Sequence, residues 1–87
     1  MSYKLYLIKD IHSCFQPQVY CFQNDDMAKR WFYQLYRDAV DREPNSALAA
    51  FPDDFQLWSV GNLNCDDGFL SCNGLNYICK LSDFKEV

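Results

Sequence analysis

The sequence predicts an α+β fold in which an antiparallel sheet of four to five strands packs against one main helix. Two observations lead to this prediction: an apolar stripe at helical spacing within residues 24–42, and short strand-like segments on both sides of it. The order is β-β-α-β-β, with residues 75–81 as a candidate fifth strand. The chain has 87 residues, so we expect residues 1–87 to form a single α+β domain.

Two N-terminal segments predict a pair of strands. Residues 3–9 (YKLYLIK) carry apolar side chains on both alternating faces, which is typical of a strand buried in the centre of a sheet. Residues 19–23 (VYCFQ) predict a second strand, and the short loop between the two favours antiparallel pairing.

The helix has the clearest pattern. Asn24 is a good N-cap, and Asp25 and Asp26 follow in the first turn, where the helix dipole favours negative charge. Pro44 ends the helix, because the residue before a proline avoids helical geometry. The apolar stripe that must face the sheet consists of Ala28, Trp31, Phe32, Leu35, Ala39 and Val40.

The second half of the chain predicts a helical turn and further strands. Residues 47–50 form the turn, and residues 55–60 (FQLWSV) a third strand. Asp67-Gly68 is a strong hairpin connection, after which residues 68–72 return as a fourth strand. Asn73-Gly74 is a second hairpin sequence, and it would separate the fourth strand from the candidate fifth.

Two acidic pairs flank the third strand, Asp53-Asp54 before it and Asp66-Asp67 after it. If residues 55–63 are extended at about 3.3 Å per residue, the pairs lie roughly 30 Å apart and cannot share a metal ion. Asp is common at such positions because its side chain caps local backbone N–H groups. We therefore interpret the pairs as turn residues and expect neither a metal site nor a cofactor; the alternative is a calcium-type site formed by either pair alone.

Charge and hydropathy restrict the classes of function. The net charge of −4 is the sum of +1 for residues 1–42 (six Lys/Arg, five Asp/Glu) and −5 for residues 43–87 (two against seven). An acidic protein is not broadly attracted to phosphate backbones, so a nucleic-acid contact needs a local basic face. No stretch approaches the roughly 18 apolar residues of a membrane span, and we expect a soluble protein of a reducing cytoplasm.

The five cysteines lack the tight CxxC spacing of a zinc site, and an odd number cannot pair fully within one chain. We interpret them as small buried apolar side chains, with zinc or disulfide use as the alternatives. These residues are Cys14, Cys21, Cys65, Cys72 and Cys79.

Motifs for catalysis are missing from the sequence. His12 and Cys14 lie two residues apart in a loop, but this spacing does not guarantee the hydrogen bond that a Cys–His dyad needs. We therefore expect no catalytic residues and no enzyme.

The basic face of the helix is the candidate site. Lys29, Tyr33 and Arg37 follow one another at intervals of four residues, and Arg30 lies beside them. Cations for phosphates beside a ring for base stacking are what single-strand DNA binders use, and the alternative is an ordinary solvated helix face. If one face of the sheet is open, further stacking rings would come from Tyr3, Tyr6 or Trp58.

Several short motifs follow one another in a characteristic order through residues 3–68. They are Tyr3-Lys4-Leu5-Tyr6 with Asp10, Asn24-Asp25 with Ala28, Pro44-Asn45-Ser46, Phe51-Pro52-Asp53-Asp54-Phe55, Leu57-Trp58, Val60-Gly61 and Asp66-Asp67-Gly68. In this pattern the chain resembles the small non-structural protein of gokushovirus-like Microviridae, which are single-stranded DNA phages. It departs from the pattern in the cysteine-rich end after residue 69.

The resemblance implies a non-structural phage protein that acts in genome replication, or in the switch to single-stranded DNA synthesis and packaging. Single-stranded DNA is then the expected partner of the helix face, and no membrane is involved. The alternative function is a protein–protein interaction module that docks on a viral or host replication protein or on a procapsid protein. Such a module, or a homo-oligomer, could use an exposed edge strand within residues 69–81.

Overall fold

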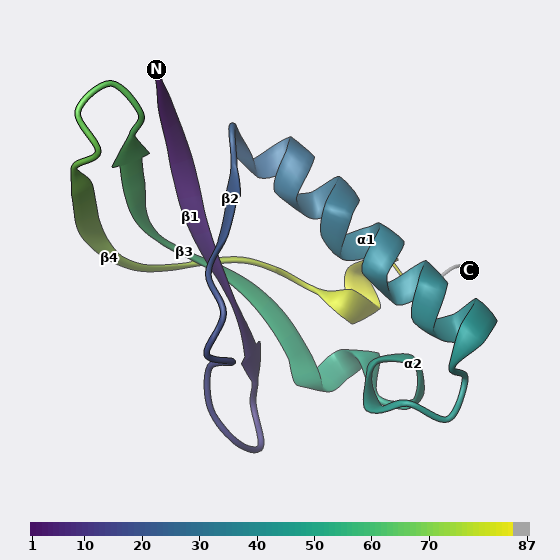
Figure 1. Cartoon of the computed structure of the whole chain (residues 1–87). Coiled ribbons are helices and arrows are strands. Elements are labelled where there is room, and N and C mark those ends of the chain that lie inside the picture. The colour runs from purple at the N-terminus through teal and green to yellow at the C-terminus, as the bar shows by residue number, and fades with distance from the viewer. Residues whose placement is uncertain (85–87) are drawn as a thin grey trace.

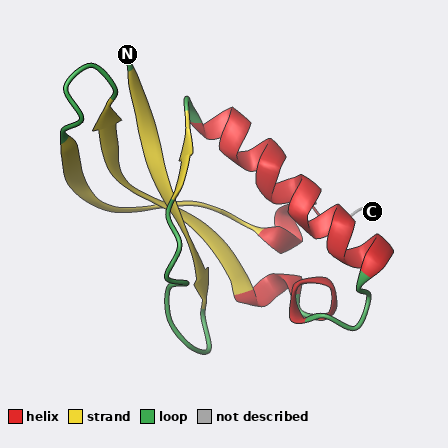
Figure 2. Cartoon of the chain, in the orientation of Figure 1, coloured by secondary structure: helices red, strands yellow, loops and turns green. Residues whose placement is uncertain are grey.

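The computed structural model describes residues 1–84, and it confirms the predicted α+β fold (Figure 1). The helices lie together on one side of an antiparallel sheet, as Figure 2 shows. The strands are β1 (Ser2–Asp10), β2 (Tyr20–Phe22), β3 (Phe55–Asn64) and β4 (Leu70–Lys80). The helices are α1 (Asp25–Arg42) and the single turn α2 (Ala47–Ala50), with 3-10 turns at Pro52–Asp54 and Leu81–Phe84.

The four strands are arranged in the order β2-β1-β3-β4, which places β1 in the interior of the sheet as its two apolar faces predicted. The candidate fifth strand is part of β4, because Asn73-Gly74 lies inside this strand and makes no hairpin turn. The physical reason is the length of β3, which extends to Asn64 and pairs with β4 on both sides of this dipeptide.

The sheet bends sharply at the level of Val60. Ser59 pairs with Asn76 and Gly61 pairs with Cys72, so one residue of β3 lies opposite three residues of β4. The pairing of β1 with β3 shifts at the same level. Bulges of this kind bend a strand and increase its twist. The outer part of the β3–β4 hairpin therefore curves away from α1 (Figure 1), and the molecule is elongated, 42 × 23 × 20 Å.

The core lies between α1 and the face of the sheet that carries Tyr6, Ile8 and Leu57. Ala28, Phe32 and Ala39 of the predicted stripe are buried, and Trp31 and Leu35 pack at the edge of this core. Val40 is an exception, since 38 % of it is exposed. The end of α1 extends beyond the sheet, where it lies against the short α2 (Figure 1). Neither helix within residues 1–84 has the length and apolar character to cross a membrane.

The prediction that the cysteines are buried is wrong for four of the five. Only Cys79 is buried, where desolvation raises the pKa of its thiol to about 11. Cys14 lies in a loop, Cys65 in a turn, and Cys21 and Cys72 on the two edge strands, β2 and β4. Loops and sheet edges expose their side chains, which explains the difference.

Asp25 fixes the start of α1 to the sheet. The side chain of Asn24 caps the helix by accepting from the Met27 N–H at 2.9 Å, as predicted. One carboxylate oxygen of Asp25 accepts from the Tyr6 hydroxyl at 2.7 Å and from Lys4 Nζ at 2.9 Å. The hydrogen bond from Tyr6 and the charge of Lys4 lower the pKa of Asp25, although partial burial opposes them.

We expect Asp25→Asn to reduce the free energy of unfolding at pH 7 by about 1–2 kcal/mol, the range for a hydrogen bond to a charged group that is partly exposed. Because the folded-state pKa of Asp25 is lowered, its contribution is present above the unfolded pKa of about 3.9 and is lost as the pH falls further. Urea unfolding at pH 7 and pH 3 should show a difference between variant and parent that shrinks at the lower pH.

The matched control is Asp26→Asn, which removes a neighbouring charge from the same helix turn. It should cost only the dipole contribution of about 0.3–1 kcal/mol. Equal losses for the two variants at pH 7 would show that the contacts of Asp25 do not stabilise the fold.

Candidate nucleic-acid interface

The four predicted site residues lie along one flank and the outer side of α1, with Lys29 at the border of the core. Helical spacing places Lys29, Tyr33 and Arg37 in one row that begins beside the buried Phe32, three residues after Lys29, and ends on the outer side of the helix at Arg37. Arg30 and Arg37 are exposed, Lys29 is half-buried, and 36 % of Tyr33 is exposed. The helix therefore presents cationic groups and one partly exposed aromatic ring in the same direction.

An open groove of about 480 Å³ lies along this side of α1. Lys29, Arg30 and Tyr33 line it together with Asp26. The structure thus brings three of the four predicted residues to one concave surface. Arg37 follows Tyr33 one helical turn later and is not among the lining residues.

Asp26 is the residue of this groove that sequence reasoning missed. It precedes Lys29 by three residues and Arg30 by four, and this spacing places it beside both cations on a helix. The spacing in the sequence could therefore have indicated that Asp26 lies beside these two cations. Its carboxylate offsets part of the positive charge of the groove, which lowers the attraction that the groove can exert on a phosphate.

Among the additional rings considered from the sequence, Tyr6 is excluded. It is fully buried in the core against α1, and its ring packs on Phe22 with centroids 5.9 Å apart. Burial and the neighbouring Asp25 also raise the pKa of its hydroxyl. Trp58 is half-buried and lies on the other face of the sheet from Leu57, while Tyr3 is half-buried near the start of β1.

His12 and Cys14 do not form a dyad. The imidazole Nε2 of His12 lies 3.2 Å from Asp54 Oδ1, and the thiol of Cys14 accepts from the Ser13 hydroxyl at 3.6 Å. His12 is largely exposed, with a side-chain exposure of 71 %. This arrangement ties the loop to the 3-10 turn before β3.

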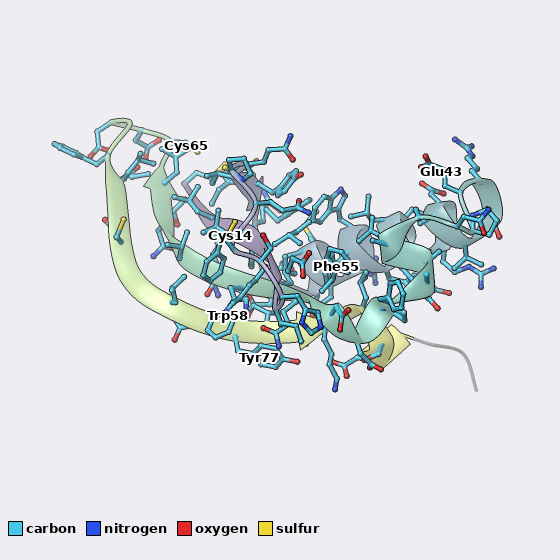
Figure 3. The ribbon with its side chains drawn as sticks, turned by 90° about the horizontal axis from the view of Figure 1, so that it is seen from below. Cys14, Glu43, Phe55, Trp58, Cys65 and Tyr77 are labelled. Carbon is cyan, nitrogen blue, oxygen red and sulfur yellow. The ribbon has the colours of Figure 1, made fainter. Side chains whose placement is uncertain are left out.

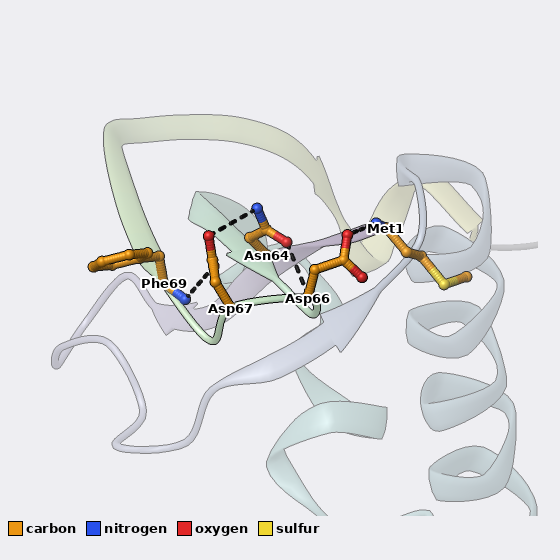
Figure 4. A network of polar contacts seen from close by, with 5 residues as sticks. All are labelled: Met1, Asn64, Asp66, Asp67 and Phe69. Atoms are coloured by element: carbon orange, nitrogen blue, oxygen red, sulfur yellow. Dashed lines mark hydrogen bonds and ion pairs between the residues drawn. The ribbon is translucent and has the colours of Figure 1, made fainter.

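The acidic pair after β3 consists of turn residues, as predicted (Figure 4). Asp67 accepts from the backbone N–H of Phe69 at 2.9 Å, and Asp66 pairs with the N-terminal ammonium of Met1 at 3.0 Å. The side chain of Asn64 closes the turn by accepting from the Asp66 N–H at 2.9 Å. Within residues 1–84 there is no cluster of three or more His, Cys, Asp or Glu side chains that could hold a metal ion.

The family profile described as phage ORF5 protein matches residues 3–84. The chain belongs to this family. The match includes the whole of β4, which the sequence resemblance through residue 68 did not reach. The phage ORF5 assignment establishes a phage protein family. Comparison with curated proteins and with solved structures finds no match.

Proposed function

We propose that this phage ORF5 family protein binds single-stranded DNA weakly through the basic side of α1. In this proposal it is a non-structural, non-enzymatic protein of a Microviridae-type phage. It acts in the host cytoplasm, in viral genome replication or in the switch to single-stranded DNA synthesis and packaging. The observation that carries the proposal is the groove in which Lys29 and Arg30 lie beside the ring of Tyr33.

The chemistry of the groove fits a single strand better than a duplex. Lys29 and Arg30 offer donors to phosphate oxygens, and Tyr33 offers a partly exposed ring to an unpaired base. With Arg37 the face carries three cations, so the logarithm of affinity should fall with the logarithm of salt with a slope of about −2. The opposing Asp26 and the net charge of −4 keep the affinity low.

We expect Lys29→Gln with Arg37→Gln to abolish retention of single-stranded DNA at low salt, because the pair removes two of the three cations of the face. The control is Arg42→Glu, which changes the net charge by the same two units but lies in the last turn of α1, away from the groove. Gel-shift titrations with an unstructured oligonucleotide measure the effect, and circular dichroism confirms folding. Equal loss of binding in the control would mean that overall charge, rather than this face, governs retention.

The alternative function is a protein–protein interaction module, and the exposed apolar side chains of the β3–β4 hairpin favour it. The exposed fractions are 71 % for Phe69, 64 % for Leu70 and 49 % for Leu75. Apolar residues gathered at an exposed edge commonly mark docking sites. Pull-down from infected cells, with and without nuclease, separates the two functions. Partners that survive nuclease support docking, and loss of all partners supports DNA binding.

A further inference from the structure

A second surface with stacking rings and cations lies on the face of the sheet that points away from α1. Along β3, Leu57 faces the core and its neighbour Trp58 faces the opposite side, because successive side chains of a strand alternate. The register places Leu7, Trp58 and Tyr77 in one row across three strands. The adjacent row consists of Lys9, Gln56 and Lys80.

We propose that this sheet face is a second binding surface for single-stranded nucleic acid, in which Trp58 and Tyr77 stack on bases and Lys9 and Lys80 hold phosphates. The inference deepens the proposed function, since it assigns the same class of ligand to a second surface of the protein. It is independent of the α1 groove in its residues. The two surfaces can therefore be tested separately.

The rings on this face are held in a fixed arrangement. Phe15, from the loop after β1, packs edge-on against Trp58 with centroids 6.0 Å apart, and Tyr77 does so from β4 at 5.6 Å. The indole Nε1 of Trp58 donates to Gln56 Oε1 at 2.9 Å, which fixes the ring orientation. Figure 3 shows Trp58 and Tyr77 close together on the curved β3–β4 ribbon. Since 47 % of Tyr77 is exposed, part of this cluster is open to a ligand.

Cations border the rings. Lys9 Nζ lies 5.3 Å from the centroid of Phe15 and 5.6 Å from that of Trp58, a distance at which a cation is attracted to an aromatic face. Lys80 lies in the same row two strands away, or about 10 Å at the usual strand spacing. An acid also lies at this border: the carboxylate of Asp83 accepts from the Lys80 backbone N–H at 3.1 Å. Burial and the charge of Asp83 raise the pKa of Tyr77.

This combination matches single-stranded nucleic acid in charge and in shape. The two rows together carry two lysines and no acid, in a protein whose net charge is −4. Phosphates pair with the lysines, and only an unpaired base can offer its face to a protein ring. A duplex would hide these base faces, so the surface selects single strands.

The test uses the tryptophan of the site as its own probe. In a Trp31→Phe background, Trp58 is the single remaining tryptophan, and Phe preserves the ring that packs on Tyr20 and Phe22. Titration with a thymidine 12-mer should quench the emission of Trp58, because a stacked base quenches indole. The anisotropy of a labelled 12-mer follows total binding in parallel.

Two variants of this face should weaken binding. Tyr77→Leu keeps an apolar side chain but removes the ring, and we expect at least a fivefold loss of affinity, the lower limit for one stacked base, about 1 kcal/mol. Lys9→Gln with Lys80→Gln should reduce the salt slope by about 1.4, the value for two phosphate contacts. Arg42→Glu again serves as the charge-matched control, and circular dichroism confirms that each variant is folded.

The outcomes distinguish the two surfaces. The sheet site is overturned if the sheet variants still bind the 12-mer, Trp58 is not quenched, and binding is lost in the Lys29→Gln, Arg37→Gln variant. That result keeps the α1 site. The α1 site is overturned if the 12-mer quenches Trp58 and only the sheet variants lose affinity for it. That result keeps the sheet site. No binding of the 12-mer by the unaltered protein at any salt overturns both. A nuclease-resistant protein partner that Tyr77→Leu releases, with Trp58 unaffected by DNA, would mean that this face docks a protein instead.

Discussion

Gly61→Ala is expected to disrupt the pairing of β3 with β4 and to destabilise the fold strongly. A Cβ atom at position 61 would lie 2.0 Å from the backbone oxygen of Ser71 and 3.1 Å from the Cα of Cys72. Both contacts are with backbone, so relief requires the strands to separate. Overpacking typically costs 1–3 kcal/mol when side chains can move, and we expect about 3 kcal/mol or more here.

Urea unfolding followed by circular dichroism measures this loss. The control is Gly68→Ala, a glycine of the turn with a φ of +78° and no atom within 4 Å of the added Cβ. That variant should lose only about 1–2 kcal/mol, the cost of a left-handed conformation for a residue with a side chain. A Gly61→Ala protein at least as stable as Gly68→Ala would show that the sheet bend does not require the close approach at Gly61.

The requirement for glycine at position 61 could not be read from the sequence, because it depends on a strand ten residues away. The sequence predicted that the third strand ended at residue 60, whereas β3 continues to Asn64. Gly61 is therefore a strand residue at a bend, where two backbones approach each other closely. Local turn preferences cannot distinguish this from the glycine of a hairpin turn.

Dependence on a distant pairing partner also explains why the hairpin predicted at Asn73-Gly74 was wrong. This dipeptide is a strong turn sequence, yet Gly74 adopts a φ of +88° within β4. The extra residues of β4 opposite Val60 accommodate the bend of the outer strand, and they use the conformational freedom of Gly74. A bulge and a turn need the same residue types, so only the pairing partner decides between them.

The helix and its basic side were predictable because both depend on local periodicity. The Asn24 cap and the buried Phe32 follow from the sequence, and the direction of Lys29 and Tyr33 follows from helical spacing. The sheet site was not predictable in the same way. Trp58 was recognised as a ring, but its neighbours Lys9 and Tyr77 come from two other strands, and only the register brings them together.

Phe32→Ala is expected to reduce the free energy of unfolding by about 3–5 kcal/mol, the usual cost of removing a buried aromatic ring. Phe32 is fully buried, in the cluster that joins α1 to Ile8 and Leu57 of the sheet. A domain of this size is typically stabilised by about 4–13 kcal/mol in total. The variant should therefore have a much lower urea midpoint and a measurable unfolded fraction at 37 °C.

Val40→Ala provides the comparison on the same helix, because 38 % of Val40 is exposed beyond the sheet. This substitution should reduce the free energy of unfolding by less than about 0.5 kcal/mol. Equal destabilisation by the two substitutions would mean that α1 is not attached to the sheet through Phe32. The groove and the core share this helix, since Lys29 and Tyr33 line the groove while Phe32, three residues after Lys29 and next to Tyr33, is buried in the core. Loosening α1 should therefore weaken the proposed DNA binding at the groove more than binding at the proposed sheet face, whose strands β1, β3 and β4 pair with one another.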